Sequence, residues 1–142
     1  MKRQQIVFIY QLLVGASDTT TGVLLLVAPA LTLHLMRLHP TAAALPYLAY
    51  IGAFVLSVGL GCFYGAWLAT RTLFATKLEV VWLLTGMTRT CVSLFVLANI
   101  FTGTMETGWL SVALSDGAIA LIQFTGIAQG WLTRGWLRDV AQ

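Results

Sequence analysis

Three ionisable residues interrupt stretches of the chain that are otherwise apolar: Asp18, Arg89 and Asp116. Counted along a helix at about 1.5 Å per residue, all three fall in the middle third of a bilayer. A charge at the centre of a membrane-spanning helix costs about 2.5–3.5 kcal/mol, so three isolated charges cost on the order of 8–10 kcal/mol. We therefore expect the three side chains to meet. Such a centre could bind a proton, a cation or an amine, or orient a polar group of a ligand.

The three charges do not balance, because two carboxylates face one guanidinium. Arg89 stays charged, and its planar fork can hold one carboxylate through two hydrogen bonds or divide itself between two. The centre then carries one negative charge, or one aspartate holds a proton. The sequence leaves open which aspartate pairs with Arg89. It also leaves open whether the centre is a functional site or a structural staple that determines which helices pair.

The residues around the three charges recur at helical spacing, which predicts a polar face on each helix. One face joins Gln11, Gly15, Asp18 and Gly22. A second joins Glu79, Trp82, Gly86, Arg89 and Ser93, and a third joins Asp116 and Gln123. These faces should turn inward because exposing them to hydrocarbon is costly. We expect Gln11 and Gln123 to support the centre as hydrogen-bonding residues.

The elements that must position these residues are membrane-spanning helices. Charged residues make up 9% of the chain, hydrophobic residues 58%, and the mean hydropathy is +0.86. Soluble globular chains have about 25% charged residues, so a water-soluble domain is excluded. Four apolar runs are long enough for spanning helices, which need about 20 residues each: 6–31, 46–70, 78–101 and 109–132. The sequence predicts an all-α, four-helix membrane bundle that forms a single transmembrane domain over residues 1–142.

The distribution of basic residues predicts the orientation of the bundle. Six lie on one side of the four runs: Lys2, Arg3, Arg71, Lys77, Arg134 and Arg138. Only Arg37 lies on the other side. Because basic loops stay in the cytoplasm, we expect both termini to be cytoplasmic and the protein to lie in an inner (plasma) membrane. The start of the chain also resembles a secretory signal, but its apolar run continues to Leu31, which favours an uncleaved anchor.

Small residues predict where helices approach closely. The second run carries a series at spacing four: Ala49, Ala53, Ser57, Gly61, Gly65 and Ala69. The fourth run carries Gly126 and Gly130 at the same spacing. Small residues let two backbones come together in a membrane. We favour packing within the bundle, and the alternative is a seam for a homo-oligomer or a membrane partner.

The remaining residues point to little other chemistry. Cys62 and Cys91 lie in different helices at different depths and are interpreted as packing residues, and His34 and His39 lie in a loop with no third metal ligand beside them. The sequence contains no catalytic motif, so no cofactor and no metal is expected, and the formal charge of +3 is too small for a nucleic-acid surface. The preferred function is a small transporter or ligand-binding membrane protein. The alternative is a non-catalytic accessory or scaffold protein, and an enzyme is less expected.

Overall fold

The computed structural model describes residues 3–71 and 75–133, and this part of the chain is helical, without strands. The four long helices are α1 (Arg3–Val27), α3 (Leu45–Ala69), α4 (Ala75–Phe101) and α5 (Leu110–Ala128). A short helix, α2 (Pro29–Leu35), and two 3-10 turns, η1 (Ala42–Ala44) and η3 (Thr107–Trp109), lie in the connections. Four helices are long and apolar enough to cross a membrane. The prediction of an all-α membrane bundle is therefore confirmed.

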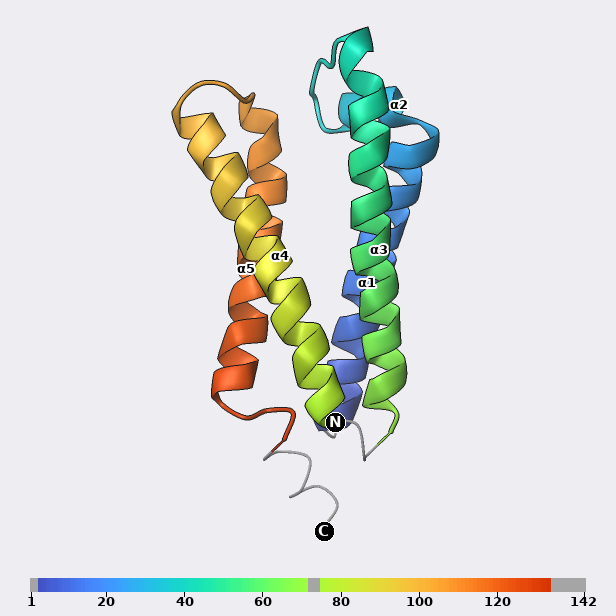
Figure 1. Cartoon of the computed structure of the whole chain (residues 1–142), viewed down its shortest axis with the longest axis vertical. Coiled ribbons are helices and arrows are strands. Elements are labelled where there is room, and N and C mark those ends of the chain that lie inside the picture. Colours follow the sequence, from blue (N-terminus) through green and yellow to red (C-terminus); the bar gives the residue numbers. More distant parts are fainter. Residues whose placement is uncertain (1–2, 72–74, 134–142) are drawn as a thin grey trace.

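The four long helices form two antiparallel pairs (Figure 1). Helix α1 packs along α3, and α4 packs along α5. The end at which α1 begins is called the proximal end here, and the opposite end is called the distal end. The two pairs come together at the proximal end, and their ribbons separate toward the distal end (Figure 1). Contacts between the pairs therefore depend on a limited set of side chains.

The first and fourth predicted runs extend four residues beyond the ends of their helices in the structure. Helix α1 ends at Val27, because Pro29 follows and disfavours the helical conformation at Ala28, whose φ and ψ are −143° and 61°. Helix α5 ends at Ala128, because Gly130 takes the left-handed conformation with a φ of 65°. There the Gly130 N–H donates to the Ile127 carbonyl and the Trp131 N–H donates to the Gly126 carbonyl, both at 2.9 Å. This is the hydrogen-bond pattern of a Schellman cap.

An apolar cluster closes each end of the bundle. The proximal cluster draws on all four long helices and the turn after α5, and its buried members are Val7, Leu68, Ala69, Leu78, Trp82 and Leu132. The distal cluster consists of Leu25, Leu33, Leu38 and Leu48, with Trp109 packed against them. Leu38 lies in the loop after α2, and Trp109 lies in η3. The distal cluster therefore joins the two pairs through their loops.

Close packing between α1 and α3 depends on glycines that the predicted series of small residues did not include. A Cβ added to Gly22 would lie 2.5 Å from the Leu56 backbone nitrogen, and one added to Gly59 would lie 2.6 Å from the Thr19 backbone nitrogen. At these points the backbones of the two helices touch. Side chains larger than hydrogen would force α1 and α3 apart.

The predicted series itself winds around α3 instead of following one face. Gly65 is buried against Gln11, but Ala53 and Ser57 are exposed and Gly61 has nothing within 4 Å of an added Cβ. Packing within the bundle is therefore wrong for Ala53, Ser57 and Gly61. The physical reason is the helical repeat: four residues turn about 40° more than one full turn. Three such steps, from Ala53 to Gly65, rotate the series by roughly 120° from the outer to the inner face.

The two glycines predicted to pack in the fourth run, Gly126 and Gly130, also have different surroundings. Gly126 packs against Trp82, since an added Cβ would lie 2.4 Å from the Trp82 ring. Gly130 lies beyond the end of α5 and caps the helix. Gly130 is also buried, so its predicted packing role stays a prediction beside the capping role that its backbone conformation shows.

Candidate functional site

Arg89 joins two carboxylates from two different helices. Its Nη1 donates to Asp116 Oδ1 on α5 at 2.5 Å, and its Nη2 donates to Asp18 Oδ2 on α1. Both contacts are also ion pairs. The prediction that the three charges meet is confirmed. The structure also answers which aspartate pairs with Arg89, because each of them does.

Similar depths on three helices allow this meeting. Asp18 lies 15 residues after the start of α1 and Arg89 lies 14 residues after the start of α4, both at the proximal end. Asp116 lies 12 residues before α5 returns to that end. At 1.5 Å per residue, the three positions lie about 18–23 Å from the proximal ends of their helices. The Arg89 side chain can then span the remaining distance between α1 and α5.

The three side chains differ in accessibility. Arg89 retains 4% of its side-chain exposure, whereas Asp18 and Asp116 retain 15% and 17%. The guanidinium is therefore enclosed, and both carboxylates keep an accessible part. With both carboxylates ionised, this centre carries a formal charge of −1. A proton or a monovalent cation bound there would bring that charge to zero.

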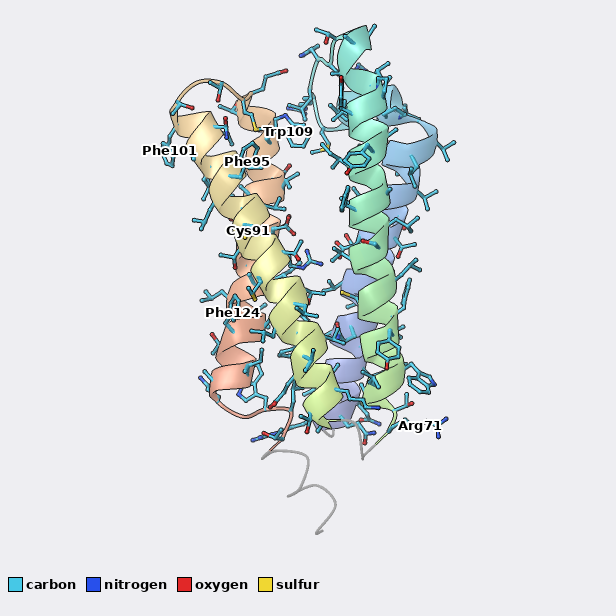
Figure 2. The ribbon with its side chains drawn as sticks, viewed as in Figure 1. Arg71, Cys91, Phe95, Phe101, Trp109 and Phe124 are labelled. Atoms are coloured by element: carbon cyan, nitrogen blue, oxygen red, sulfur yellow. The ribbon has the colours of Figure 1, made fainter. Side chains whose placement is uncertain are left out.

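Helix α3 contributes a fourth group near the centre, Cys62. The Cys62 side chain is completely buried and lies close enough to Arg89 to interact with it electrostatically. It also packs against α1, since a Cβ added to Gly15 would lie 3.2 Å from the Cys62 Cβ. The interpretation of Cys62 as a packing residue agrees with this contact, but its closeness to Arg89 was not predicted. Cys91, in contrast, is exposed on α4, and Figure 2 labels it.

Gln11 and Gln123 are both buried inside the bundle, but neither makes a hydrogen bond to the three charges within the described residues. Gln123 donates through Nε2 to Thr85 Oγ1 at 2.9 Å, and Thr85 donates in turn to the Val81 carbonyl at 2.7 Å. Gln11 lies against α3, because a Cβ added to Gly65 would lie 2.2 Å from Gln11 Nε2. The two amides therefore belong to the interior on the proximal side of the centre.

Two aromatic residues with polar atoms lie beside these amides, and sequence reasoning did not assign them to the site. The rings of Tyr10 on α1 and Trp82 on α4 have centroids 5.3 Å apart, and the Tyr10 hydroxyl lies beside Gln123. Trp82 is 2% exposed. The signal that could have found Trp82 was its place on the predicted polar face of α4, seven residues before Arg89. Tyr10 carried no such signal, since its neighbours are determined by how α1 meets α4 and α5.

A contact between His39 and Glu106 joins the two helix pairs at the distal end. Glu106 accepts a hydrogen bond from the His39 backbone nitrogen at 3.3 Å, and its other carboxylate oxygen lies 3.5 Å from His39 Nδ1. These side chains are 84% and 51% exposed. Within residues 3–71 and 75–133, no three His, Cys, Asp or Glu side chains are grouped as a metal site would require.

Comparison with known proteins adds no assignment. The chain matches no protein-family model, no curated protein and no solved structure. The geometry around Arg89 is therefore the basis for the function proposed below.

Proposed function

We propose that the protein is a small membrane transporter or ligand-binding protein whose centre, Asp18–Arg89–Asp116, binds a proton, a cation or a polar group of a ligand. One observation carries the proposal: an enclosed guanidinium is shared by two carboxylates that both remain partly accessible. Ionisable residues inside a membrane are costly and mark binding sites or proton relays by default. The surplus negative charge favours a positively charged ligand, because attraction between charges is stronger in the interior than in water.

The proposed setting is an inner (plasma) membrane with both termini in the cytoplasm. The described basic residues Arg3, Arg71 and Lys77 all lie at the proximal end, and this distribution supports a cytoplasmic proximal end. Lys2, Arg134 and Arg138, which the orientation also uses, lie outside the described residues. Lipid is the expected partner of the outer helix faces. Ala53 and Ser57 are exposed, and Gly61 has open space beside it. A seam for a homo-oligomer or a membrane partner is therefore the remaining interpretation of these three residues.

A second candidate is an accessory or scaffold protein in which the same charges act as a structural staple. The two ion pairs of Arg89 favour this second candidate, because they connect α1 of one helix pair to α5 of the other. A staple requires paired charges, but it requires neither ligand binding nor a change in protonation. The two candidates therefore differ in what the carboxylates do when pH or cations change.

Infrared spectroscopy of the protein in lipid vesicles tests this difference. The carbonyl band of a protonated carboxyl is followed while pH is lowered, and then while sodium, potassium or methylammonium is added at constant pH. We expect a band that responds to pH or to a cation and that Asp18→Asn or Asp116→Asn alters. Glu106→Gln, which changes an exposed carboxyl in the distal loop, is the matched control and should leave the band unchanged.

Proton flux into the same vesicles, loaded with a pH-sensitive dye, separates transport from binding alone. Folded Asp18→Asn and Asp116→Asn variants should lose flux that the Glu106→Gln variant retains. If the carboxyl spectrum ignores both pH and cations, and the wild-type protein carries no flux, the staple is the better account.

A further inference from the structure

Buried polar atoms without hydrogen bonds gather on the proximal side of Arg89. Seven such atoms occur in the described part of the chain, and six of them lie on Arg89 and on four residues closer to the proximal end. These four residues, Tyr10, Gln11, Trp82 and Gln123, are called the polar layer here. The six atoms are Arg89 Nε, Tyr10 Oη, Gln11 Nε2 and Oε1, Trp82 Nε1 and Gln123 Oε1. Each buried polar atom left unpaired costs about 1–3 kcal/mol, so this number of them in one region requires an explanation.

The layer is continuous with the centre. Trp82, Thr85 and Arg89 follow one another on one face of α4 at spacings of three and four, and span about 10 Å. Tyr10 contacts the Trp82 ring, lies beside Gln123, and is close enough to Arg89 to interact electrostatically. Gln123 is joined to Thr85 by a hydrogen bond of 2.9 Å. Polar groups thus lie at successive depths between the centre and the proximal apolar cluster, of which Trp82 is a member.

The unpaired atoms supply both donors and acceptors. Arg89 Nε, Trp82 Nε1 and Gln11 Nε2 donate, the carbonyl oxygens of Gln11 and Gln123 accept, and the Tyr10 hydroxyl does both. These groups come from three different helices, and none of the six atoms has a hydrogen-bond partner within the described residues. A water molecule suits such a place, since it makes two to four hydrogen bonds to buried polar groups. A larger ligand does not, because both glutamines are fully buried and Gln11 lies tightly against Gly65.

We propose that the polar layer holds a chain of water molecules that carries protons between the proximal apolar cluster and the Asp18–Arg89–Asp116 centre. This rests on the proposed function, and it names the proton as the ion that the centre exchanges. An excess proton passes from one water to the next by exchange of O–H bonds. The Tyr10 hydroxyl can take part in this exchange, whereas the amides and the Trp82 N–H hold waters in place.

The last step of the transfer is an ordinary acid–base reaction. The terminal water gives its excess proton to an aspartate oxygen, a carboxylate becomes a carboxylic acid, and the formal charge of the centre changes from −1 to 0. The reverse steps release the proton. No other reactant is needed. The proximal apolar cluster lies between the layer and the proximal end and is the barrier that the proton must cross.

Isotope exchange at the centre tests this proposal in the full-length protein in vesicles. The medium is changed from H₂O to D₂O, and the time course of the shift in the carboxyl band of the centre is recorded. The test variants are Gln11→Met with Gln123→Met, and Tyr10→Phe. Methionine keeps the unbranched shape and removes both hydrogen-bonding groups. We expect the double variant to slow the exchange at least tenfold, and Tyr10→Phe to slow it to a smaller extent.

Two matched controls lie outside the layer. Gln129→Met changes an exposed glutamine beyond α5, and Tyr64→Phe changes an exposed tyrosine that stacks on Trp67. Both should exchange at the wild-type rate. The Gln11 side chain makes no hydrogen bond within the described residues, so replacing it by an apolar side chain of similar shape costs little stability. Gln123→Met also removes the 2.9 Å hydrogen bond to Thr85, but the Thr85 hydroxyl keeps its bond to the Val81 carbonyl, so the test variants should fold. Circular dichroism checks this before exchange is measured.

The possible results separate this proposal from the proposed function. If the carboxyl band responds to pH as in the wild type but the double variant exchanges at the wild-type rate, protons reach the centre by another route and the water chain is overturned. If the wild-type centre shows no protonated carboxyl at any pH, the proton-binding form of the proposed function fails. In that case, infrared bands of buried water that shift in H₂¹⁸O and disappear in the double variant would show that the layer holds water. Its role in carrying protons to the centre would nevertheless be overturned.

Discussion

Replacing Arg89 by methionine provides the most direct test of the electrostatic argument. The change removes the cation but keeps an unbranched side chain of similar shape, and it leaves two carboxylates that are 15% and 17% exposed without a partner. At 4 Å and an effective dielectric constant of 20, each ion pair is worth about 4 kcal/mol before desolvation is subtracted. Removing one partner from a buried pair costs about 3–5 kcal/mol net. We expect a loss of this size, which corresponds to a change in the unfolding equilibrium of about 10²-fold to several thousandfold.

The measurement is the free energy of unfolding in mixed micelles, obtained by titration with dodecyl sulfate and followed by circular dichroism at neutral pH. A triple variant, Asp18→Asn with Arg89→Met and Asp116→Asn, removes all three charges. It should recover most of the loss, because no uncompensated charge then remains inside. Arg71→Met is the matched control: Arg71 is exposed and lies over the Trp67 ring at 5.6 Å. Its loss should cost at most about 1 kcal/mol.

Two outcomes would refute the reasoning. If Arg89→Met costs less than about 1 kcal/mol, the carboxylates do not depend on the guanidinium, since an unpaired buried charge is far more expensive. If the triple variant is as unstable as Arg89→Met alone, the loss comes from the missing volume of the arginine rather than from unpaired charge. Either result would remove the physical basis of the proposed centre.

Two further predictions concern the glycines. Gly22→Ala should lower the free energy of unfolding by about 1–3 kcal/mol, because its Cβ would meet the Leu56 backbone. Gly61→Ala has open space around the added Cβ and should change this free energy by no more than about 0.5 kcal/mol. The reverse ranking would contradict the α1–α3 contact. Gly130→Ala should cost about 1–2 kcal/mol, since its left-handed φ of 65° is unfavourable for residues with a side chain, and an unchanged stability in the same titration would speak against the cap.

The sequence alone was sufficient for the four spanning helices. Crossing a bilayer requires a long apolar run with internally satisfied backbone hydrogen bonds, and this requirement can be read one run at a time. The limits of predicting these helices from the sequence appear at the helix ends. Pro29 lies within the predicted first run and ends α1 at Val27, and the consequence of a proline for the preceding residue is local enough to have been used.

The meeting of Asp18, Arg89 and Asp116 was also predictable. Charges within a membrane are expensive enough that few arrangements are acceptable, and residue counting placed all three at a similar depth. The inward positions of Gln11 and Gln123 followed from the same helix faces. Whether the centre functions as a binding site is a separate question, because position and charge are compatible with both a ligand site and a staple.

Only the tertiary structure decided which residues touch across helices. Small size did not distinguish Gly61, which meets nothing, from Gly59 and Gly65, which lie against α1, because a series at spacing four rotates away from any fixed face. Likewise, Cys62 lies near Arg89, and Tyr10 beside Trp82 and Gln123, because of how α1, α3, α4 and α5 are oriented. Each spanning helix must meet the requirements of the bilayer by itself, so its apolar run can be recognised in the sequence of that segment alone. Contacts between helices depend on the rotation and approach of two surfaces at once, and no single segment records them.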